Sequence, residues 1–268
     1  MGSVDTLEDL AEFALELAAA GEVICPLFRN SKVRDKSAKG RFDPVTQADL
    51  AAERRMREMI RARYPDHGVR GEEMPESAAG GAYSWLLDPI DGTHSFVYGL
   101  PTWMTLVALL HEGRPLIGVA SQPLLGEAFL GMPGGAWRIA AGRRERLRVR
   151  GTERLGQALT GTTLPDIYET AAQRAVLEAM RQAARQVRYD ADAYFYALLA
   201  AGQTDLAFDT GLSAHDIAAL IPIVRGAGGL ITDWDGKADP LGGDVLAAST
   251  PALHDQALEL LARARGKG

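Results

Sequence analysis

Two carboxylates follow a short apolar run in the segment WLLDPIDGTHSF, residues 85–96. A proline and an isoleucine separate Asp88 from Asp91, and Gly92 and Thr93 come directly after them. A strand that ends in two acids is costly to bury unless a cation or hydrogen bonds compensate the charges. If the residues between the acids turn the chain sharply, both can face one Mg²⁺, whose ligands are oxygen atoms. The N–H groups of Gly92 and Thr93 could then bind an anion, and this combination suits phosphate-ester chemistry.

Further acids stand near the ends of expected elements. They are Asp43 and Asp49 in DPVTQAD, Glu72 and Glu73 in GEE, and Asp216 in HDIAAL. Each also has a purely structural interpretation. Asp49 lies three residues after Thr46, which fits a helix capping box, and Asp216 has the same relation to Ser213. The paired glutamates fit a solvated turn.

An aspartate pair before Gly-Thr also occurs in phosphatases of the haloacid dehalogenase type, where the first aspartate is a covalent nucleophile. In those enzymes the acids are two residues apart and usually lie near the N-terminus. Here the spacing is three, and Asp88 follows two expected helices. This mismatch argues against that class of phosphatase.

The composition is that of an ordinary globular protein, with 47% hydrophobic and 24% charged residues in 268. A net charge of −6 and the lack of a long basic block argue against a nucleic-acid partner. Cys25 is the only cysteine, which excludes an internal disulfide and thiolate metal clusters. No apolar run approaches ~18 residues and no secretory pattern is present, so we expect a cytoplasmic protein without a membrane partner.

Hydrophobic periodicity predicts the elements that must position the acids. Helical spacing of apolar residues predicts helices over 6–20 and 47–63. The segments TLVALL and LIGVASQ, joined by the turn HEGRP, predict a hairpin, and EAFLGM and AWRIA predict two further strands. The first half therefore has the α+β pattern.

The second half alternates between helices and strands. Strands are expected near 158–162 and at DLAFD, GLITDW and DVLAAS, and helices at 166–184, ADAYFYALLAAG, 214–225 and ALHDQALELLARA. This alternation predicts layered α/β structure. Residues 141–157 are polar and basic and are expected to be a linker surface. We place a boundary there, between a sub-domain 1–150 that carries most of the acids and a sub-domain 151–268 that supplies Asp216 and substrate contacts.

In combination and in this order, GEE, DPIDGTHSF and HDIAAL followed by GAGG resemble the three signatures of the inositol monophosphatase superfamily. DPVTQAD resembles the upstream segment of the same family, so the similarity spans nearly the whole chain. The resemblance implies an α/β fold, layered as an αβαβα sandwich of the inositol monophosphatase and fructose-1,6-bisphosphatase type. It also implies a Mg²⁺-dependent phosphomonoesterase that acts on a small phosphorylated metabolite and forms a homodimer.

The resemblance assigns the metal ligands. Glu72, Asp88 and the carbonyl of Ile90 would hold one Mg²⁺. Asp88, Asp91 and Asp216 would hold a second, with a weaker third ion near Glu72.

The catalytic and phosphate-binding groups follow from the same resemblance. Thr93, oriented by Asp49, would help to deprotonate the metal-bound water that attacks phosphorus, and Glu72 would also be catalytic. The N–H groups of Gly92 and Thr93 would bind the phosphate. A family lysine near the metal loop corresponds to Lys36 or Lys39, and the sequence does not choose between them.

Longer segments resemble bacterial-type histidinol-phosphate phosphatases. They are GVASQPLLGEAFLG, YDADAYFYALLAAGQTDLAFD and HDIAALIPIVRGAGGLITDWDG. In that branch the positions of Asp192 and Asp209, together with Asp91, lie near the alcohol part of the substrate. Carboxylates suit a cationic amino alcohol, so we expect L-histidinol phosphate as substrate, in histidine biosynthesis. Asp192 also fits a helix cap.

The sequence departs from this pattern at His215, where the family usually has an aromatic residue, and at Asp209, which is shorter than the usual glutamate. Neither departure is expected to touch the metal ligands. Inositol 1-phosphate, or a nucleotide or sugar phosphate, remains an alternative substrate. From another functional class, a catalytically silent phosphate- or metal-binding protein remains open.

Overall fold

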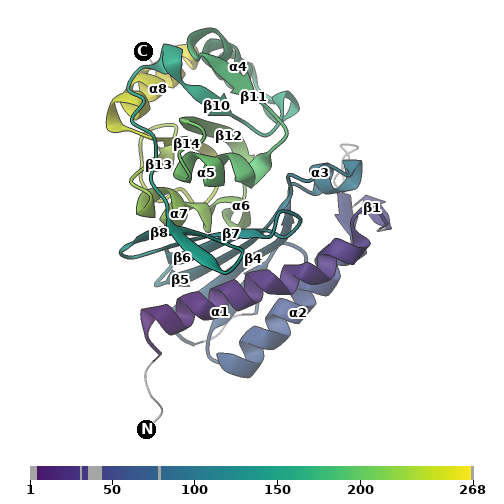
Figure 1. The fold of residues 1–268 in the computed structure, drawn as a ribbon. Coiled ribbons are helices and arrows are strands. Elements are labelled where there is room, and N and C mark those ends of the chain that lie inside the picture. The colour runs from purple at the N-terminus through teal and green to yellow at the C-terminus, as the bar shows by residue number, and fades with distance from the viewer. Residues whose placement is uncertain (1–4, 31, 36–43, 78–79, 267–268) are drawn as a thin grey trace.

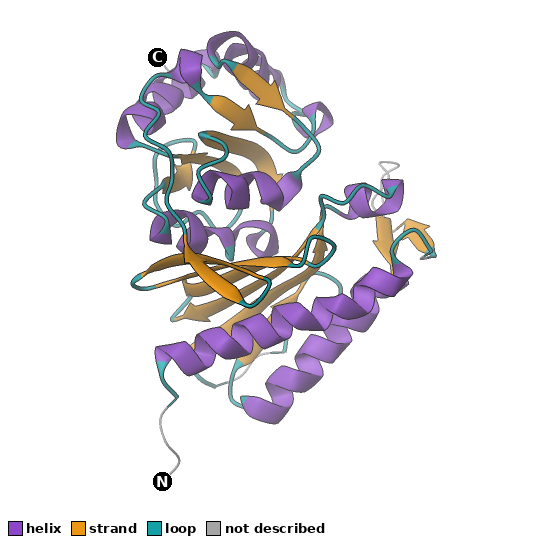
Figure 2. Ribbon diagram, in the orientation of Figure 1, coloured by secondary structure: helices purple, strands orange, loops and turns teal. Residues whose placement is uncertain are grey.

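The computed structural model describes residues 5–30, 32–35, 44–77 and 80–266. Helices and sheets alternate in layers, and the predicted αβαβα sandwich is confirmed (Figures 1 and 2). Among the described helices, none is long and apolar enough to cross a membrane.

The central layer is a seven-stranded sheet. In spatial order its strands are β3 (Gly68–Gly71), β4 (Tyr83–Asp91), β5 (Met104–His111), β6 (Arg114–Gln122), β7 (Glu127–Met132), β8 (Gly135–Ala140) and β9 (Arg143–Arg146). β3 and β4 are parallel, and all other neighbours are antiparallel. The strands from β5 to β8 agree with the prediction.

The edge strand β9 corrects the prediction that residues 141–157 form only a linker. All of its residues are exposed, so it has no hydrophobic alternation from which it could be recognised. It pairs with β8, and the guanidinium of Arg144 lies 4.3 Å from the ring centre of Trp137. Pairing with a neighbouring strand, and not sequence pattern, defines this element.

Two helices cover the outer face of this sheet, α1 (Leu7–Ala19) and α2 (Gln47–Arg63) (Figure 1). Both were predicted, and both begin with a capping box. Their apolar stripes pack on the sheet in one hydrophobic core. A 3₁₀ helix (Ala20–Leu27) continues α1, and β1 (Val33–Asp35) pairs with β2 (Pro44–Thr46) ahead of α2.

Three helices lie between the two sheets: α5 (Asp192–Ala200), α6 (Ala214–Ile217) and α7 (Leu220–Gly226) (Figure 1). The sequence predicted one helix over 214–225, and the structure has two. Pro222 explains the break between them. It has no N–H to donate to the carbonyl four residues earlier, as a continuous helix would require.

Close backbone contact fixes α6 and α7 on the central sheet. A Cβ atom on Gly118 would lie 1.9 Å from the carbonyl oxygen of Ala219, and one on Gly131 would lie 2.2 Å from the nitrogen of Ile223. The core in this layer includes Leu106 from the first half and residues from the second half. It is therefore continuous across the predicted boundary near residue 150, and that boundary stays a prediction.

The second sheet has five strands. In spatial order they are β11 (Gln186–Arg188), β10 (Leu159–Gly161), β12 (Leu206–Leu212), β14 (Gly243–Ala248) and β13 (Leu230–Asp233). The helices α4 (Ala171–Ala183) and α8 (Pro251–Ala264) form the outermost layer. Of these elements, the sequence missed β11, which has three residues and one half-buried side chain.

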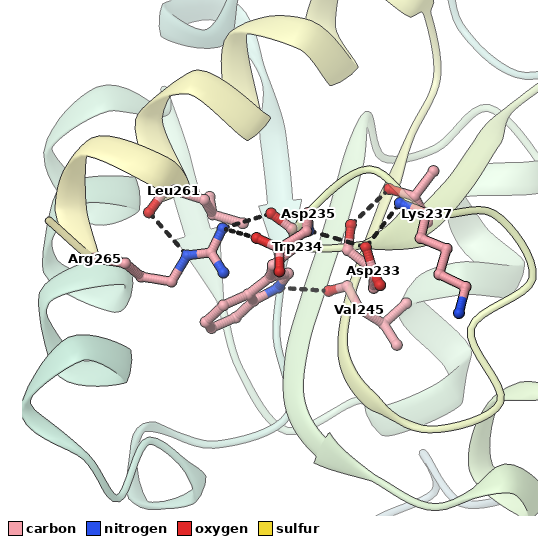
Figure 3. A network of polar contacts seen from close by, with 8 residues as sticks. Asp233, Trp234, Asp235, Lys237, Val245, Leu261 and Arg265 are labelled. Atoms are coloured by element: carbon pink, nitrogen blue, oxygen red, sulfur yellow. Dashed lines mark hydrogen bonds and ion pairs between the residues drawn. The ribbon is translucent and has the colours of Figure 1, made fainter. Parts of the chain in front are cut away.

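Arg265 ties the end of α8 to the turn after β13 (Figure 3). Its guanidinium donates to the carbonyl of Trp234 at 2.6 Å and lies 3.0 Å from Asp235 Oδ1. It also lies against the face of the Trp234 ring. These contacts join the end of α8 to the turn after β13 and do not involve the acids of the central sheet.

Candidate functional site

β4 ends in an irregularity that brings two acids to one site. Asp88 pairs with Leu106, and Asp91 pairs with Met104. Between these two pairs, β4 therefore contains one residue more than β5. A regular strand would point residues three apart to opposite faces, and one extra residue reverses this. Asp88 Oδ1 also accepts a hydrogen bond from the nitrogen of Ile90 at 3.1 Å. In place of the sharp turn expected between the two acids, an irregularity within the continuous strand β4 brings them together.

Asp216 reaches the same place from α6. Its carboxylate offers an oxygen that lies, with oxygens of Asp88 and Asp91, in a group whose members are all within 4.8 Å of one another. Asp216 Oδ2 accepts from the nitrogen of Ser213 at 2.6 Å and completes a capping box. The structural and functional interpretations of Asp216 are thus compatible, because the cap orients the carboxylate.

Glu72 follows β3, and its loop is held from α2 by a buried ion pair. Glu53 Oε2 accepts from the nitrogen of Glu73 at 2.8 Å, and Arg57 donates to the carbonyl of Met74 at 3.0 Å. Glu53 and Arg57 pair with each other at 2.7 Å. The sequence analysis missed this clamp, although an acid and an arginine four residues apart on the apolar side of α2 were a visible signal.

His215 corrects an expectation of the sequence analysis. One of its ring nitrogens lies, with oxygens of Glu72 and Asp88, in a second group whose members are within 4.8 Å of one another. Its Nε2 is also 3.3 Å from Asp216 Oδ1. The departure from the usual aromatic residue is therefore next to the predicted metal ligands, because α6 presents neighbouring residues to the same acids.

The charges at this site favour a cation. Burial, and then the nearby carboxylates, raise the pKa of both Asp88 and Asp91 well above the usual range. A cavity of about 210 Å³ opens beside them. Its acidic lining residues are Glu72, Asp91, Asp192, Asp209 and Asp216. Among the described residues, no lysine or arginine lines this cavity, so the donor set fits divalent metal ions.

Asp49 and Thr93 both lie near this site, and Asp49 forms the capping box with Thr46 that was its structural interpretation. Asp49 Oδ2 accepts from the nitrogen and hydroxyl of Thr46 at 2.8 and 2.6 Å. The hydroxyl of Thr93 donates to the carbonyl of Ile90 at 3.0 Å. Within the described residues, the buried Asp49 Oδ1 has no hydrogen-bond partner. Burial raises the pKa of Asp49 to about 6, against the lowering effect of the Thr46 bonds.

Gly92 directly follows Asp91 and lies against Asp192. It is the N-cap of the short helix α3 (Thr93–Tyr98), with a left-handed φ of 79°. A Cβ atom here would lie 2.6 Å from Asp192 Oδ2. Backbone conformation and space therefore both require glycine at this position.

Asp192 lies on the first residue of α5 and faces this turn. Its Oδ2 accepts from the Ser95 hydroxyl at 3.0 Å, and burial raises its pKa to about 7. Asp192 is not the helix cap that was the alternative, since Ala191 has that position. Instead, Asp91 Oδ2 accepts from the nitrogen of Ala193 at 2.8 Å, which links the end of β4 to α5.

Asp209 is almost fully buried and is held by three donors. They are the nitrogen of Thr163 at 2.7 Å, the hydroxyl of Thr162 at 2.9 Å and the hydroxyl of Tyr196 at 2.9 Å. Burial nevertheless raises its pKa to about 6. These donors hold the Asp209 carboxylate in the cavity wall.

A second cavity, of about 570 Å³, adjoins the first and shares Asp192 and His94 with it. It is lined by His94, Ser95, Tyr98, Leu100, Leu164, Asp166, Asp190 and Asp192. The charged groups among these described residues are acids, and Tyr98 is 77% exposed. The other predicted site residues, Lys36, Lys39 and Asp43, lie outside the described residues.

The sequence profile of the inositol monophosphatase family matches residues 6–266. The chain belongs to this family. It is therefore a phosphatase, and the family relationship agrees with the acidic metal-binding cluster described above.

The relatives carry more than one name. The chain is 40% identical to the bifunctional phosphatase IMPL2, chloroplastic, of Arabidopsis thaliana, over 91% of this chain and 72% of that protein. It is 37% identical to the histidinol-phosphatase of Mycobacterium tuberculosis, over 81% of this chain and 84% of that protein. A solved inositol monophosphatase from Zymomonas mobilis superposes with a TM-score of 0.84 at 34% identity, covering 96% of this chain and 99% of the other.

Proposed function

We propose that this phosphatase hydrolyses L-histidinol phosphate to L-histidinol, with Mg²⁺ as cofactor. One observation carries the proposal: next to the metal-binding acids, the charged groups among the described cavity-lining residues are carboxylates, apart from a histidine that both cavities share. The leaving alcohol of histidinol phosphate carries an ammonium and an imidazole group, and both are cations when protonated. The hydroxyls of a neutral polyol could donate hydrogen bonds to Asp192 and its acidic neighbours, but a polyol would need fewer charges.

We propose two metal sites. Asp88, Asp91 and Asp216, whose carboxylate oxygens lie within 4.8 Å of one another, would hold one ion. The family resemblance adds a second site made of Glu72, Asp88 and the carbonyl of Ile90. A third, weaker ion near Glu72 is part of the proposal. When bound, divalent cations acidify the attacking water and offset the charge of the phosphoryl oxygens.

The chain's own groups orient the reactants. The Thr93 hydroxyl donates its proton to Ile90, so its oxygen lone pairs are available to accept a hydrogen bond from water. The N–H groups of Gly92 and Thr93, at the start of α3, would bind the phosphate oxygens. Asp49, raised in pKa by burial, is the adjacent acid that we propose as a proton acceptor.

Substrate preference would come from Asp192, Asp209 and Asp91. Asp192 lines both cavities, so it lies between the phosphate side and the wider acidic pocket. Tyr98 and Leu100 give that pocket an apolar side for a ring. The histidinol-phosphatase name of one relative supports this assignment, and the inositol monophosphatase name of another supports the alternative.

Phosphate release from a substrate panel, with and without Mg²⁺, tests the proposal. The panel is L-histidinol phosphate, inositol 1-phosphate, fructose 1,6-bisphosphate and a 3′,5′-bisphosphonucleoside. We expect the highest kcat/KM for histidinol phosphate and no turnover without metal. Preference for another ester would refute the substrate, and metal-independent turnover would refute the mechanism.

The variant Asp192→Asn makes the test sharper, because asparagine keeps an acceptor for Ser95 but removes the charge. We expect about a tenfold or larger loss of kcat/KM for histidinol phosphate, from a lost charge interaction of at least ~1.4 kcal/mol. Inositol 1-phosphate, which lacks a cation, serves as the internal control and should be affected less. Equal losses for both esters would contradict a charge-based preference.

We further propose a cytoplasmic homodimer, on the family resemblance alone, which sedimentation of the purified protein tests. Phosphate binding by calorimetry without turnover on any ester would instead favour a catalytically silent binding protein.

A further inference from the structure

His215 is the residue at this site that the family pattern does not explain. It lies in α6 beside Asp216, and its side chain is 17% exposed. One ring nitrogen is within 4.8 Å of carboxylate oxygens of both Glu72 and Asp88, which are themselves within that distance of each other. The imidazole therefore lies beside two of the acids that are proposed to hold a cation.

We propose that the cation between Glu72 and Asp88 takes the His215 imidazole nitrogen as a ligand, so that this site favours Mn²⁺, relative to Mg²⁺, more than a site with oxygen ligands alone would. The inference rests on the metal dependence of the proposed function, but it concerns the ligand set and not the substrate. It assigns to His215 a role that an aromatic residue at the same position could not have.

Ligand chemistry gives the direction of the preference. Mg²⁺ binds oxygen donors and keeps much of its water, so an imidazole nitrogen adds little to its affinity. Transition metals accept imidazole readily, and Mn²⁺ also retains affinity for carboxylates. A site with two carboxylates and one imidazole therefore favours Mn²⁺ more than a site with oxygen ligands alone.

The surrounding contacts fit this assignment. The carbonyl of Ile90 accepts the Thr93 hydroxyl at 3.0 Å and keeps a second lone pair, so His215 would add to this proposed ligand and not replace it. A histidine that binds a metal commonly donates its other N–H to a carboxylate, which fixes the tautomer. With Nδ1 as the ligand nitrogen, Asp216 Oδ1, which lies 3.3 Å from Nε2 of His215, would be that carboxylate.

Pulsed electron paramagnetic resonance of the metal-free protein loaded with Mn²⁺ tests the proposal directly. We expect a ¹⁴N coupling from a coordinated imidazole in the wild type and its loss in His215→Asn. His94→Gln is the matched control, because His94 lines the same cavity but does not belong to the described acid–histidine group. Its spectrum should keep the coupling. A wild-type spectrum without ¹⁴N coupling, or a coupling that persists in His215→Asn, overturns the proposal.

Calorimetry then separates coordination from simple orientation of Asp216. His215→Asn should bind Mn²⁺ at least about tenfold more weakly, the scale known for groups that support metal ligands. Its Mg²⁺ affinity should change less than about threefold, because imidazole adds little to a Mg²⁺ site. Equal losses for both metals would mean that His215 only orients Asp216 and would overturn the proposal.

The outcomes of the metal-binding tests and of the substrate panel are distinguishable. Turnover with a nitrogen-free Mn²⁺ spectrum would refute the inference and leave the phosphatase assignment intact. A nitrogen-coordinated Mn²⁺ without histidinol phosphate turnover would do the reverse. If His215→Asn unfolds, the wild-type spectrum together with His215→Trp, which restores an aromatic side chain, decides the question.

Discussion

Asp88 is the residue on which both predicted metal sites depend, since it belongs to both groups of potential ligands. It is 1% exposed, and its charge is opposed first by burial and then by Glu72 and Asp91. Without a cation, this charge destabilises the fold. A residue that is needed for metal binding therefore reduces the stability of the metal-free protein.

Asp88→Asn should separate these two effects. We expect kcat to fall by orders of magnitude, since both metal sites lose a charged ligand. The metal-free variant should at the same time be more stable at pH 8, by roughly 1–3 kcal/mol, because an uncompensated buried charge is removed. Urea denaturation in a chelator measures the stability, and Asp255→Asn, an exposed change on α8, is the control. A near-normal kcat would contradict the shared-ligand role.

Asp209 should give the metal-free protein a pH-dependent stability. Its pKa in the folded protein is about 6, raised from 3.8 by burial, so between these values the folded state holds a proton that the unfolded chain releases. The stabilising contribution is present below about pH 4 and is lost as the pH rises through 6. Asp209→Asn removes this dependence.

Urea denaturation from pH 4 to pH 7 measures the effect. Relative to the wild type, the variant should gain on the order of 3 kcal/mol across this range. Parallel stability curves for the two proteins would contradict a raised pKa for Asp209.

At the scale of elements, the ion pair on α2 acts on the loop after β3. Glu53 and Arg57 bind backbone groups of Glu73 and Met74, the two residues after Glu72. A Cβ atom on Gly71, the residue before Glu72, would lie 2.2 Å from Glu53 Oε1, so the contact is close. Through these contacts, α2 positions the loop that carries the Glu72 carboxylate.

Glu53→Gln should weaken both the fold and the metal site. Breaking one member of a buried ion pair costs about 3–5 kcal/mol, and loss of a group that orients a metal ligand lowers metal affinity about 10–100-fold. Thermal unfolding and metal calorimetry measure the two effects. Glu58→Gln, at an exposed position of the same helix, is the control. Unchanged metal affinity in Glu53→Gln would show that the clamp does not position Glu72.

At the scale of the whole molecule, the site joins distant parts of the chain. Asp88 and Asp91 come from the central sheet, and Asp216 comes from a helix between the two sheets. Metal binding should therefore stabilise the entire fold and not one segment.

We expect Mg²⁺ or Mn²⁺ at 100 times its dissociation constant to add about 2.7 kcal/mol to the free energy of unfolding. In Asp216→Asn, this metal-dependent increase should be much smaller at the same metal concentration. The variant lacks the charged metal ligand that comes from the helix layer between the two sheets. Denaturation with and without metal measures it. An increase equal to that of the wild type would show that Asp216 is not a ligand.

The sequence by itself determined the family, the acids and most of the long elements. Glu72, Asp88, Asp91 and Asp216 were recognised because their residue types and spacing are local properties of the chain. The helices predicted over 6–20 and 47–63 are observed over 7–19 and 47–63, since apolar periodicity and capping residues act within one element.

Only the tertiary structure decided how these residues meet. The extra residue between Asp88 and Asp91, the bond from Ala193 to Asp91, and the approach of His215 to Glu72 all depend on partners far away in the sequence. The exposed strand β9 likewise exists through its pairing with β8. Strand register and packing between layers are set by the whole fold, and no local pattern encodes them.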